Sequence, residues 1–181
     1  ARRLADGGPV WTRRPGTGAP ISATPALGTT AVYVADESGA LYALDTISGD
    51  SLWSCTANGA IRSSPAVAVT EDDEIVIFGA DDGTVYAVDT SAALTCTPSE
   101  PCNCGQVAVW TIALDAPVGR SSPAIDFDGT VYIGTESGRL YAIGAPAADP
   151  TPTGTPTPTG TPTPTGTPEP STTSTPFVPG S

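Results

Sequence analysis

The cysteines carry the most reactive side chains of this sequence, and their number and context favour disulfides over catalysis or metal binding. The sequence has no histidine and four cysteines, Cys55, Cys96, Cys102 and Cys104. Neither a Ser-His-Asp nor a Cys-His nucleophile can therefore be assembled, and the paired Cys-x-x-Cys knuckles of a zinc site are missing. An even number of cysteines in a chain with a Thr/Pro-rich tail predicts disulfides and an oxidising compartment. Three pairings are possible; we favour Cys55 bonded into the segment 96–104, with the remaining pair closing the loop Thr97 to Pro101.

The carboxylates are predicted to be structural. Asp72, Asp73 and Glu74 directly precede a predicted strand and are expected to form a solvated turn. The run Asp126-Phe-Asp128-Gly129 begins like a calcium-binding loop but lacks the later ligands of an EF-hand, so we predict a hairpin turn. From these patterns we predict no catalytic residue, no cofactor and no metal ligand.

The elements around these residues form a repeat. A Gly-x-apolar-Tyr-Ala-apolar strand occurs three times, and a second predicted strand precedes each copy. Before that comes a Ser/Thr-Pro-Ala segment, and a tryptophan lies upstream of each such segment. This gives four strands per unit at a spacing of roughly 40 to 45 residues, typical of a propeller blade. The equivalent residues are Gly39, Gly83 and Gly138; Tyr42, Tyr86 and Tyr141; and Trp11, Trp53 and Trp110.

The segment Ala43-Leu-Asp45-Thr-Ile-Ser48-Gly49-Asp-Ser-Leu-Trp53 resembles the tryptophan-docking repeat of the quinoprotein-like (PQQ-type) β-propeller family, with Ser48 in place of threonine. The second copy keeps Ala87 and Asp89 without the Thr-Gly step, and the third ends at Gly144 without a Trp strand. The resemblance implies one of two kinds of protein. Some members are dehydrogenases that bind quinone and calcium beside adjacent cysteines, and others are non-catalytic, such as the lipoprotein scaffold of outer-membrane protein assembly. Because Asn103 separates Cys102 from Cys104, no cofactor residue can be transferred to this chain.

We therefore predict an all-β fold, a partial β-propeller of about three four-stranded antiparallel blades. Residues 1–8 are expected to be a linker, 9–146 the repeat domain and 147–181 a Thr/Pro-rich tail or stalk. The third blade, 118–143, has three predicted strands, whereas Pro9 to Thr12 is expected to be an orphan Trp strand. Arg62 and Arg120 occupy matching positions and are expected to pair with carboxylates of neighbouring blades.

The tail is predicted to be an extended polyproline II segment, because its many prolines fix φ and remove backbone donors. Phe177 and Val178 near its end are apolar enough to enter a groove on a neighbouring molecule. The threonines of the repeat are candidate O-glycosylation sites, so attached glycans are a candidate partner. They are Thr151, Thr153, Thr155, Thr157, Thr159, Thr161, Thr163, Thr165 and Thr167.

The charge of the chain excludes two classes of partner. The net charge is −12 and every basic residue is arginine, whereas nucleic acids and anionic membranes require clustered positive charge. No apolar stretch is long enough to span a bilayer, and no signal peptide is visible. Since the sequence begins with alanine and has no methionine, we expect a processed or truncated product.

The spare Trp strand and the incomplete third blade are complementary, because an open sheet edge accepts another strand. We therefore predict a non-catalytic extracellular or cell-surface protein, structural or adhesive, that self-associates head to tail as a ring or fibre. Val10, Trp11, Phe177 and Val178 are the expected assembly residues. The alternative is a fragment of a PQQ-dependent dehydrogenase-like or carbohydrate-active enzyme.

Overall fold

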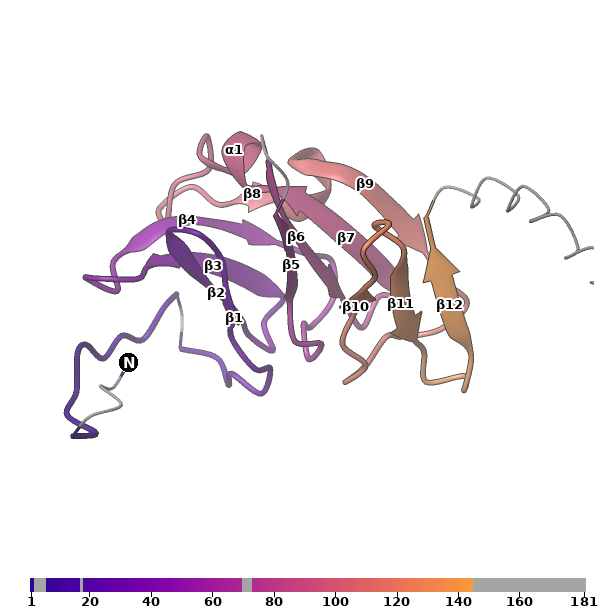
Figure 1. Ribbon diagram of the computed structural model, residues 1–181, viewed down its shortest axis with the longest axis horizontal. Helices are drawn as coiled ribbons and strands as arrows, with labels where there is room; N and C mark the ends of the chain where they lie inside the picture. The colour runs from indigo at the N-terminus through magenta and orange to yellow at the C-terminus, as the bar shows by residue number, and fades with distance from the viewer. Residues whose placement is uncertain (2–5, 17, 70–72, 145–181) are drawn as a thin grey trace, which may run out of the picture. The chain divides into compact units, whose positions relative to one another are not determined.

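The computed structural model describes residue 1 and residues 6–16, 18–69 and 73–144. These residues contain three sheets that follow one another along the chain and are mainly antiparallel (Figure 1). The chain divides into a unit formed by Ala1–Pro146 and a second unit formed by Ala147–Ser181. The second unit, with the predicted polyproline tail, the candidate glycosylation sites, Phe177 and Val178, lies outside the described residues. The prediction of an all-β, partial propeller-like fold is confirmed.

The consecutive strands of each blade form an up-and-down antiparallel meander. Blade 1 contains β1 (Ala26–Leu27), β2 (Ala31–Ala35), β3 (Ala40–Asp45) and β4 (Ser51–Thr56). Blade 2 contains β5 (Ala66–Val69), β6 (Glu74–Gly79), β7 (Thr84–Asp89) and β9 (Ala108–Ala113). Within the described residues, blade 3 contains β10 (Ala124–Ile125), β11 (Val131–Gly134) and β12 (Leu140–Ile143) and no fourth strand.

The repeated glycine is explained by the turn between the second and third strand of each blade. Gly39, Gly83 and Gly138 have φ of 91°, 82° and 81°, a conformation that side chains with a Cβ rarely adopt. Each donates its backbone N–H to the carbonyl three residues earlier, at 3.1, 3.0 and 3.0 Å. The same turn therefore starts each Tyr-bearing strand in the same register.

Packing between blades uses equivalent positions each time. In blade 1 the side chains that face blade 2 are Tyr33, Leu41, Ala43 and Trp53, and they pack against Val76, Phe78, Tyr86 and Val88. In blade 2 the equivalent residues are Ile77, Val85, Ala87 and Trp110, and they pack against Val131, Ile133, Tyr141 and Ile143 of blade 3. The Ser/Thr-Pro-Ala segments add hydrogen bonds between blades, from Thr24 N to Ser64 Oγ (2.8 Å) and from Ser64 N to Ser122 Oγ (3.1 Å).

Blade 2 contains an insertion between β7 and β9 that blade 1 lacks between β3 and β4, and this insertion has secondary structure of its own. It forms α1 (Thr90–Ala93), β8 (Cys102–Asn103) and a 3-10 turn, η1 (Cys104–Gln106). Strand β8 pairs in parallel with β4 and becomes the fifth strand of blade 1. The predicted disulfides are present as Cys55–Cys104 and Cys96–Cys102. The insertion therefore attaches blade 2 to the outer edge of blade 1.

The orphan strand predicted around Trp11 is not formed, and Trp11 is instead attached by its side chain. Its indole N–H donates to the carbonyl of Thr46 at 3.1 Å, and its ring lies against Gly49 and the cluster of Val34, Tyr42 and Leu44. A fourth strand of a blade pairs with the third strand of that blade, and no such neighbour precedes Trp11 within the described residues. Of the two contacts expected of a Trp strand, strand pairing and docking of the tryptophan side chain, the segment around Trp11 therefore makes only the second.

Candidate functional site

The open edge of blade 3 is the first candidate binding surface. Strand β12 pairs with β11 on one side, and no strand of the described part of the chain pairs with its other side. In blades 1 and 2 this position is held by β4 and β9. An unpaired edge presents backbone donors and acceptors to any extended segment that approaches it.

The outward face of blade 3 carries the same kinds of side chain as the faces that pack between blades, but no blade within the described residues packs on it. Tyr132 and Leu140 occupy the positions of Tyr33 and Leu41 in blade 1. Tyr33 and Leu41 are 2% and 0% exposed, whereas Tyr132 and Leu140 are 39% and 75% exposed. Hence side chains that are buried between blades elsewhere in this chain are in contact with solvent here.

The opposite end of the domain carries the matching surface. Val32, Val34, Tyr42 and Leu44 of blade 1 occupy the positions with which blades 2 and 3 receive the preceding blade, and Trp11 packs on them. A hollow of about 310 Å³ remains beside Trp11, lined mostly by apolar side chains. Trp53 belongs to the same core cluster as the receiving positions of blade 2, and Trp11 packs on the equivalent positions of blade 1.

Each repeated tyrosine donates its hydroxyl to an aspartate, although the aspartates come from different places in the repeat. Burial and the nearby carboxylate of Asp36 raise the pKa of Tyr42 to about 12. The tyrosines were recognisable from the sequence as a repeat, whereas their acceptors were missed because they occupy no common position. The pairs are Tyr42 with Asp36 (3.0 Å), Tyr86 with Asp82 (2.9 Å) and Tyr141 with Asp115 (2.7 Å).

The two repeated arginines behave differently. Arg62 forms ion pairs with Asp81 and with Glu37 of the preceding blade (3.8 Å to the latter), which confirms the prediction for this residue. Arg120 is exposed at a hollow that Glu136 also lines, and within the described residues no ion pair joins it to a carboxylate. The expected pairing is therefore wrong for Arg120.

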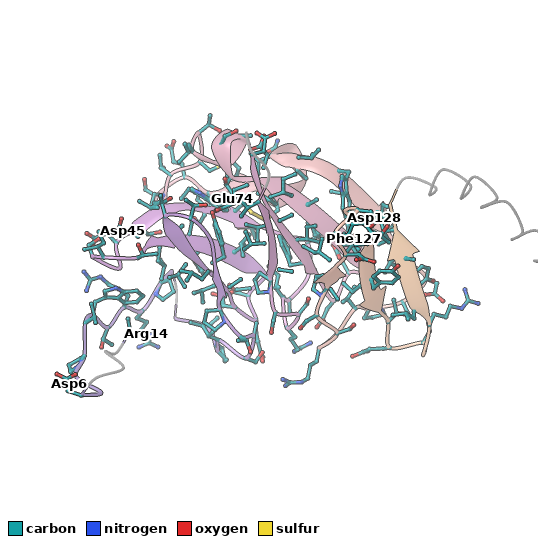
Figure 2. The ribbon with its side chains drawn as sticks, viewed as in Figure 1. Asp6, Arg14, Asp45, Glu74, Phe127 and Asp128 are labelled. Atoms are coloured by element: carbon teal, nitrogen blue, oxygen red, sulfur yellow. A yellow bond between two sulfur atoms is a disulfide. The ribbon has the colours of Figure 1, made fainter. Side chains whose placement is uncertain are left out.

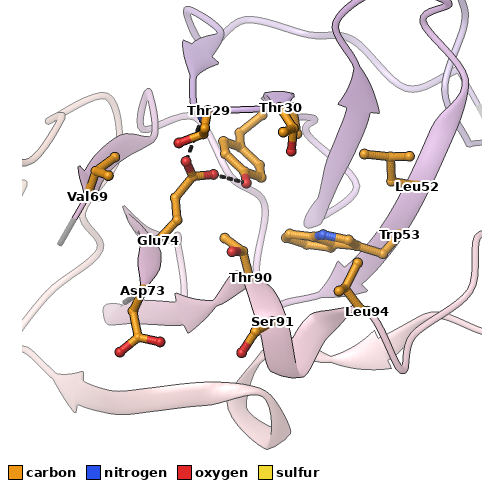
Figure 3. A pocket seen from close by; sticks show the side chains of 12 residues that line it. Thr29, Thr30, Leu52, Trp53, Val69, Asp73, Glu74, Thr90, Ser91 and Leu94 are labelled. Atoms are coloured by element: carbon orange, nitrogen blue, oxygen red, sulfur yellow. Dashed lines mark hydrogen bonds between the residues drawn. The ribbon is translucent and has the colours of Figure 1, made fainter. Parts of the chain in front are cut away.

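A pocket of about 340 Å³ lies between blades 1 and 2, beside Trp53 (Figure 3). Glu74, labelled in Figure 2, extends into this region from the start of β6. It accepts hydrogen bonds from the Tyr33 hydroxyl and from the backbone N–H of Thr29 (2.6 Å).

The expectation of a solvated turn is therefore wrong for Glu74, because β6 directs its side chain towards blade 1. Asp73 is exposed and Asp72 lies outside the described residues. The run 126–129 does form the turn between β10 and β11, where Figure 2 labels Phe127 and Asp128.

Glu74 is held as a carboxylate. Desolvation by burial acts to raise its pKa, but the hydrogen bonds from Tyr33 and Thr29 outweigh this effect and lower the pKa below 4.5. Burial, and then the hydrogen bond to Glu74, raise the pKa of Tyr33. The pair therefore remains an ionised acid accepting from a neutral phenol at ordinary pH.

We expect the Glu74 carboxylate to make the stability of the domain depend on pH. A lowered pKa in the folded state stabilises the protein above the unfolded pKa, and this contribution is lost as pH falls through the folded value. Glu74→Gln should lower the free energy of unfolding by about 1 kcal/mol at neutral pH and by less in acid. Urea unfolding at several pH values measures this difference. Glu100→Gln, on an exposed loop, is the matched control, and a Glu74→Gln difference that does not shrink in acid would contradict the assignment.

The described residues hold no cluster of three or more His, Cys, Asp or Glu side chains that could bind a metal ion. None of the helices within the same residues has the length and apolar character that crossing a membrane requires. Within the described residues, the fold therefore brings together an open sheet edge, the exposed outward face of blade 3, a face of blade 1 on which Trp11 packs, and an acidic pocket.

These features define a protein built of PQQ-like propeller blades, in which successive sheets pack through the same positions of a repeated motif. The chain belongs to the family described as outer membrane protein assembly factor BamB, whose family model matches residues 1–148.

One relative by sequence and two solved structures are similar to the chain. The outer membrane protein assembly factor BamB of Yersinia pestis is 29% identical over 116 residues, which are 62% of this chain and 25% of that protein. The crystal structure of BamB from Moraxella catarrhalis is similar with a TM-score of 0.56 and 22% identity, over 76% of this chain and 37% of that one. A structure of BBS1N in complex with ARL6DN has a TM-score of 0.54 at 15% identity, over 72% of this chain and 38% of that one. The two structural matches bear on the fold alone, and this chain spans well under half the length of each relative.

Proposed function

We propose that this chain is a non-catalytic scaffold of the cell surface or extracellular space that self-associates head to tail through its blade interfaces. The observation that carries the proposal is the three-stranded blade 3, whose edge and outward face lack the partners that the equivalent positions have in blades 1 and 2. Two disulfides favour an oxidising compartment. The relatives named as outer membrane assembly factors support a scaffold of the envelope over an enzyme.

A second copy is the occupant that fits blade 3. Blade 1 of a neighbouring molecule carries Val32, Val34 and Leu44 at the positions with which blades 2 and 3 receive the blade before them. Val34 and Leu44 are only 6% and 4% exposed, so docking would join blade 3 to this face together with the Trp11 that packs on it. Trp11 is already seated on that surface. When blade 3 of one molecule docks on blade 1 of the next, the segment around Trp11 lies where the missing fourth strand would pair with β12. The neighbour therefore supplies both the face and the strand.

The outward face of blade 3 provides the test. Leu140→Arg places a charge on a side chain that is 75% exposed, so the fold should be kept, while docking would bury the charge and weaken association at least tenfold. Sedimentation velocity over a range of concentrations measures the association. Ile47→Arg, at a position 82% exposed in the turn between β3 and β4, is the matched control and should associate like the unmodified chain.

Mixing variants distinguishes head-to-tail contacts from other contacts. Leu140→Arg keeps the blade 1 surface, and Trp11→Ala keeps the blade 3 surface. Each variant alone should remain a monomer, whereas the mixture should form dimers that do not grow further, because only one competent contact is available. An unmodified chain that stays monomeric throughout, or a Leu140→Arg chain that associates normally, would refute the proposal.

A further inference from the structure

The pocket beside Trp53 arises where the chain departs from its own repeat. In blade 1, the turn that follows Asp45 receives Trp11, with the indole N–H bonded to Thr46 and the ring packed on Gly49. In blade 2, the equivalent Asp89 instead caps α1, accepting from the N–H groups of Ser91 (2.8 Å) and Ala92 (3.3 Å). The insertion has replaced the turn that would receive Trp53.

As a result, the indole N–H of Trp53 has lost its acceptor. Trp53 is 1% exposed, and within the described residues no hydrogen bond from its Nε1 is present, although the side chain lines the pocket. Figure 3 shows the nitrogen-bearing edge of the ring turned towards Thr30 and the pocket interior. Among the described residues, the fully buried side-chain polar atoms without a partner are Ser51 Oγ and Asp81 Oδ1, so the Trp53 nitrogen is a donor that reaches the pocket rather than one sealed in the core. The pocket is large enough to hold an acceptor for it.

The other side chains that line the pocket are of three kinds: acidic, hydroxyl-bearing and apolar. Glu74 presents a carboxylate whose pKa is lowered, and the hydroxyl-bearing side chains of Thr30 and Thr90 lie around the same hollow. Leu52 and Leu94 supply apolar surface on the Trp53 side. The residues of the lining that the structure describes include no arginine or lysine.

From this lining we infer that the pocket binds one monosaccharide unit of a neutral glycan. The Glu74 carboxylate accepts one hydrogen bond on each oxygen, from Thr29 and Tyr33, and each oxygen can accept another. The Trp53 N–H is a donor open to an acceptor, and closely spaced hydroxyl groups supply both donors and acceptors. The C–H face of a sugar ring suits Leu52 and Leu94, and the volume of about 340 Å³ lies at the small end of ligand pockets. An amine would satisfy Glu74 but leave the Trp53 donor without a partner. This inference does not depend on self-association.

Titration of the full chain with neutral disaccharides, cellobiose and chitobiose, tests the inference by following the indole N–H resonances in ¹H–¹⁵N NMR spectra. We expect at least one of the two sugars to shift the Trp53 signal with a weak, about millimolar, dissociation constant. Trp53→Phe keeps a ring but removes the donor, so affinity, followed on the backbone amides of Thr30 and Ser91, should fall about two- to tenfold. Trp110→Phe, the equivalent residue outside the pocket, is the matched control and should bind normally.

Thr30→Val is a second variant at the pocket rim that keeps the test valid if Trp53→Phe fails to fold, and it should also weaken binding. No response to either disaccharide well above millimolar concentration would overturn the inference. The same holds if spermidine, but no sugar, shifts the Trp53 signal and Glu74→Gln abolishes that shift. Because the titration reports on the pocket and sedimentation reports on the blade faces, either proposal can fail without the other.

Discussion

Trp53→Ala should lower the free energy of unfolding by about 3–5 kcal/mol, the usual cost of truncating a fully buried large aromatic residue. Trp53 is 1% exposed and packs against Tyr33, with ring centroids 5.8 Å apart, in the largest core cluster. That cluster joins blades 1 and 2, so the cavity would open at the main interface of the domain. Urea unfolding followed by circular dichroism measures the loss.

Trp110→Ala is the matched control because Trp110 holds the equivalent position in β9 but is only partly buried. We expect it to cost about 1–2 kcal/mol, since less apolar surface is lost from the core. Equal losses for the two variants would contradict the view that the interface between blades 1 and 2 dominates stability.

Removing the Cys55–Cys104 disulfide, with both cysteines changed to alanine, should cost about 4 kcal/mol in the chain-entropy description of cross-links. This bond closes a loop of sequence separation 49, and it joins β4 of blade 1 to the insertion of blade 2. Without it the unfolded chain gains freedom, and β8 is held on β4 by only a short parallel pairing. Denaturant unfolding and hydrogen exchange at Asn103 would show the two effects together.

The Cys96–Cys102 bond provides the control within the same protein. Its sequence separation is 6, so its removal should cost about 2 kcal/mol by the same relation. The order of the two losses is the prediction, and a larger loss for the short loop would show that strain or residual structure in the unfolded state governs the result. Since small domains have about 5–15 kcal/mol of stability in total, either loss would be easily measured.

Much of the fold is encoded locally and could be predicted from the sequence. The Gly-x-apolar-Tyr-Ala strands, their turns and their spacing depend on residues a few positions apart, because a glycine at positive φ and alternating side chains act within one hairpin. The three blades, the missing strand of blade 3 and the pairing of Arg62 across blades follow from that repetition.

Other features were decided by the tertiary structure alone. Three of these features join segments that lie far apart in the chain: the pairing of β8 with β4, the docking of Trp11 by its side chain, and the hydrogen bonds that Glu74 accepts from Tyr33 and Thr29. A fourth feature, the absence of an acceptor for the Trp53 N–H, also depends on segments that are distant in the sequence. Each feature depends on which sheet edge or hydrogen-bond donor remains free once the blades have stacked. The local periodicity of the sequence does not determine which edge or donor this is. An unpaired edge or donor is satisfied by whatever group the completed fold brings near it, which is a property of the assembled sheets rather than of any one stretch of sequence.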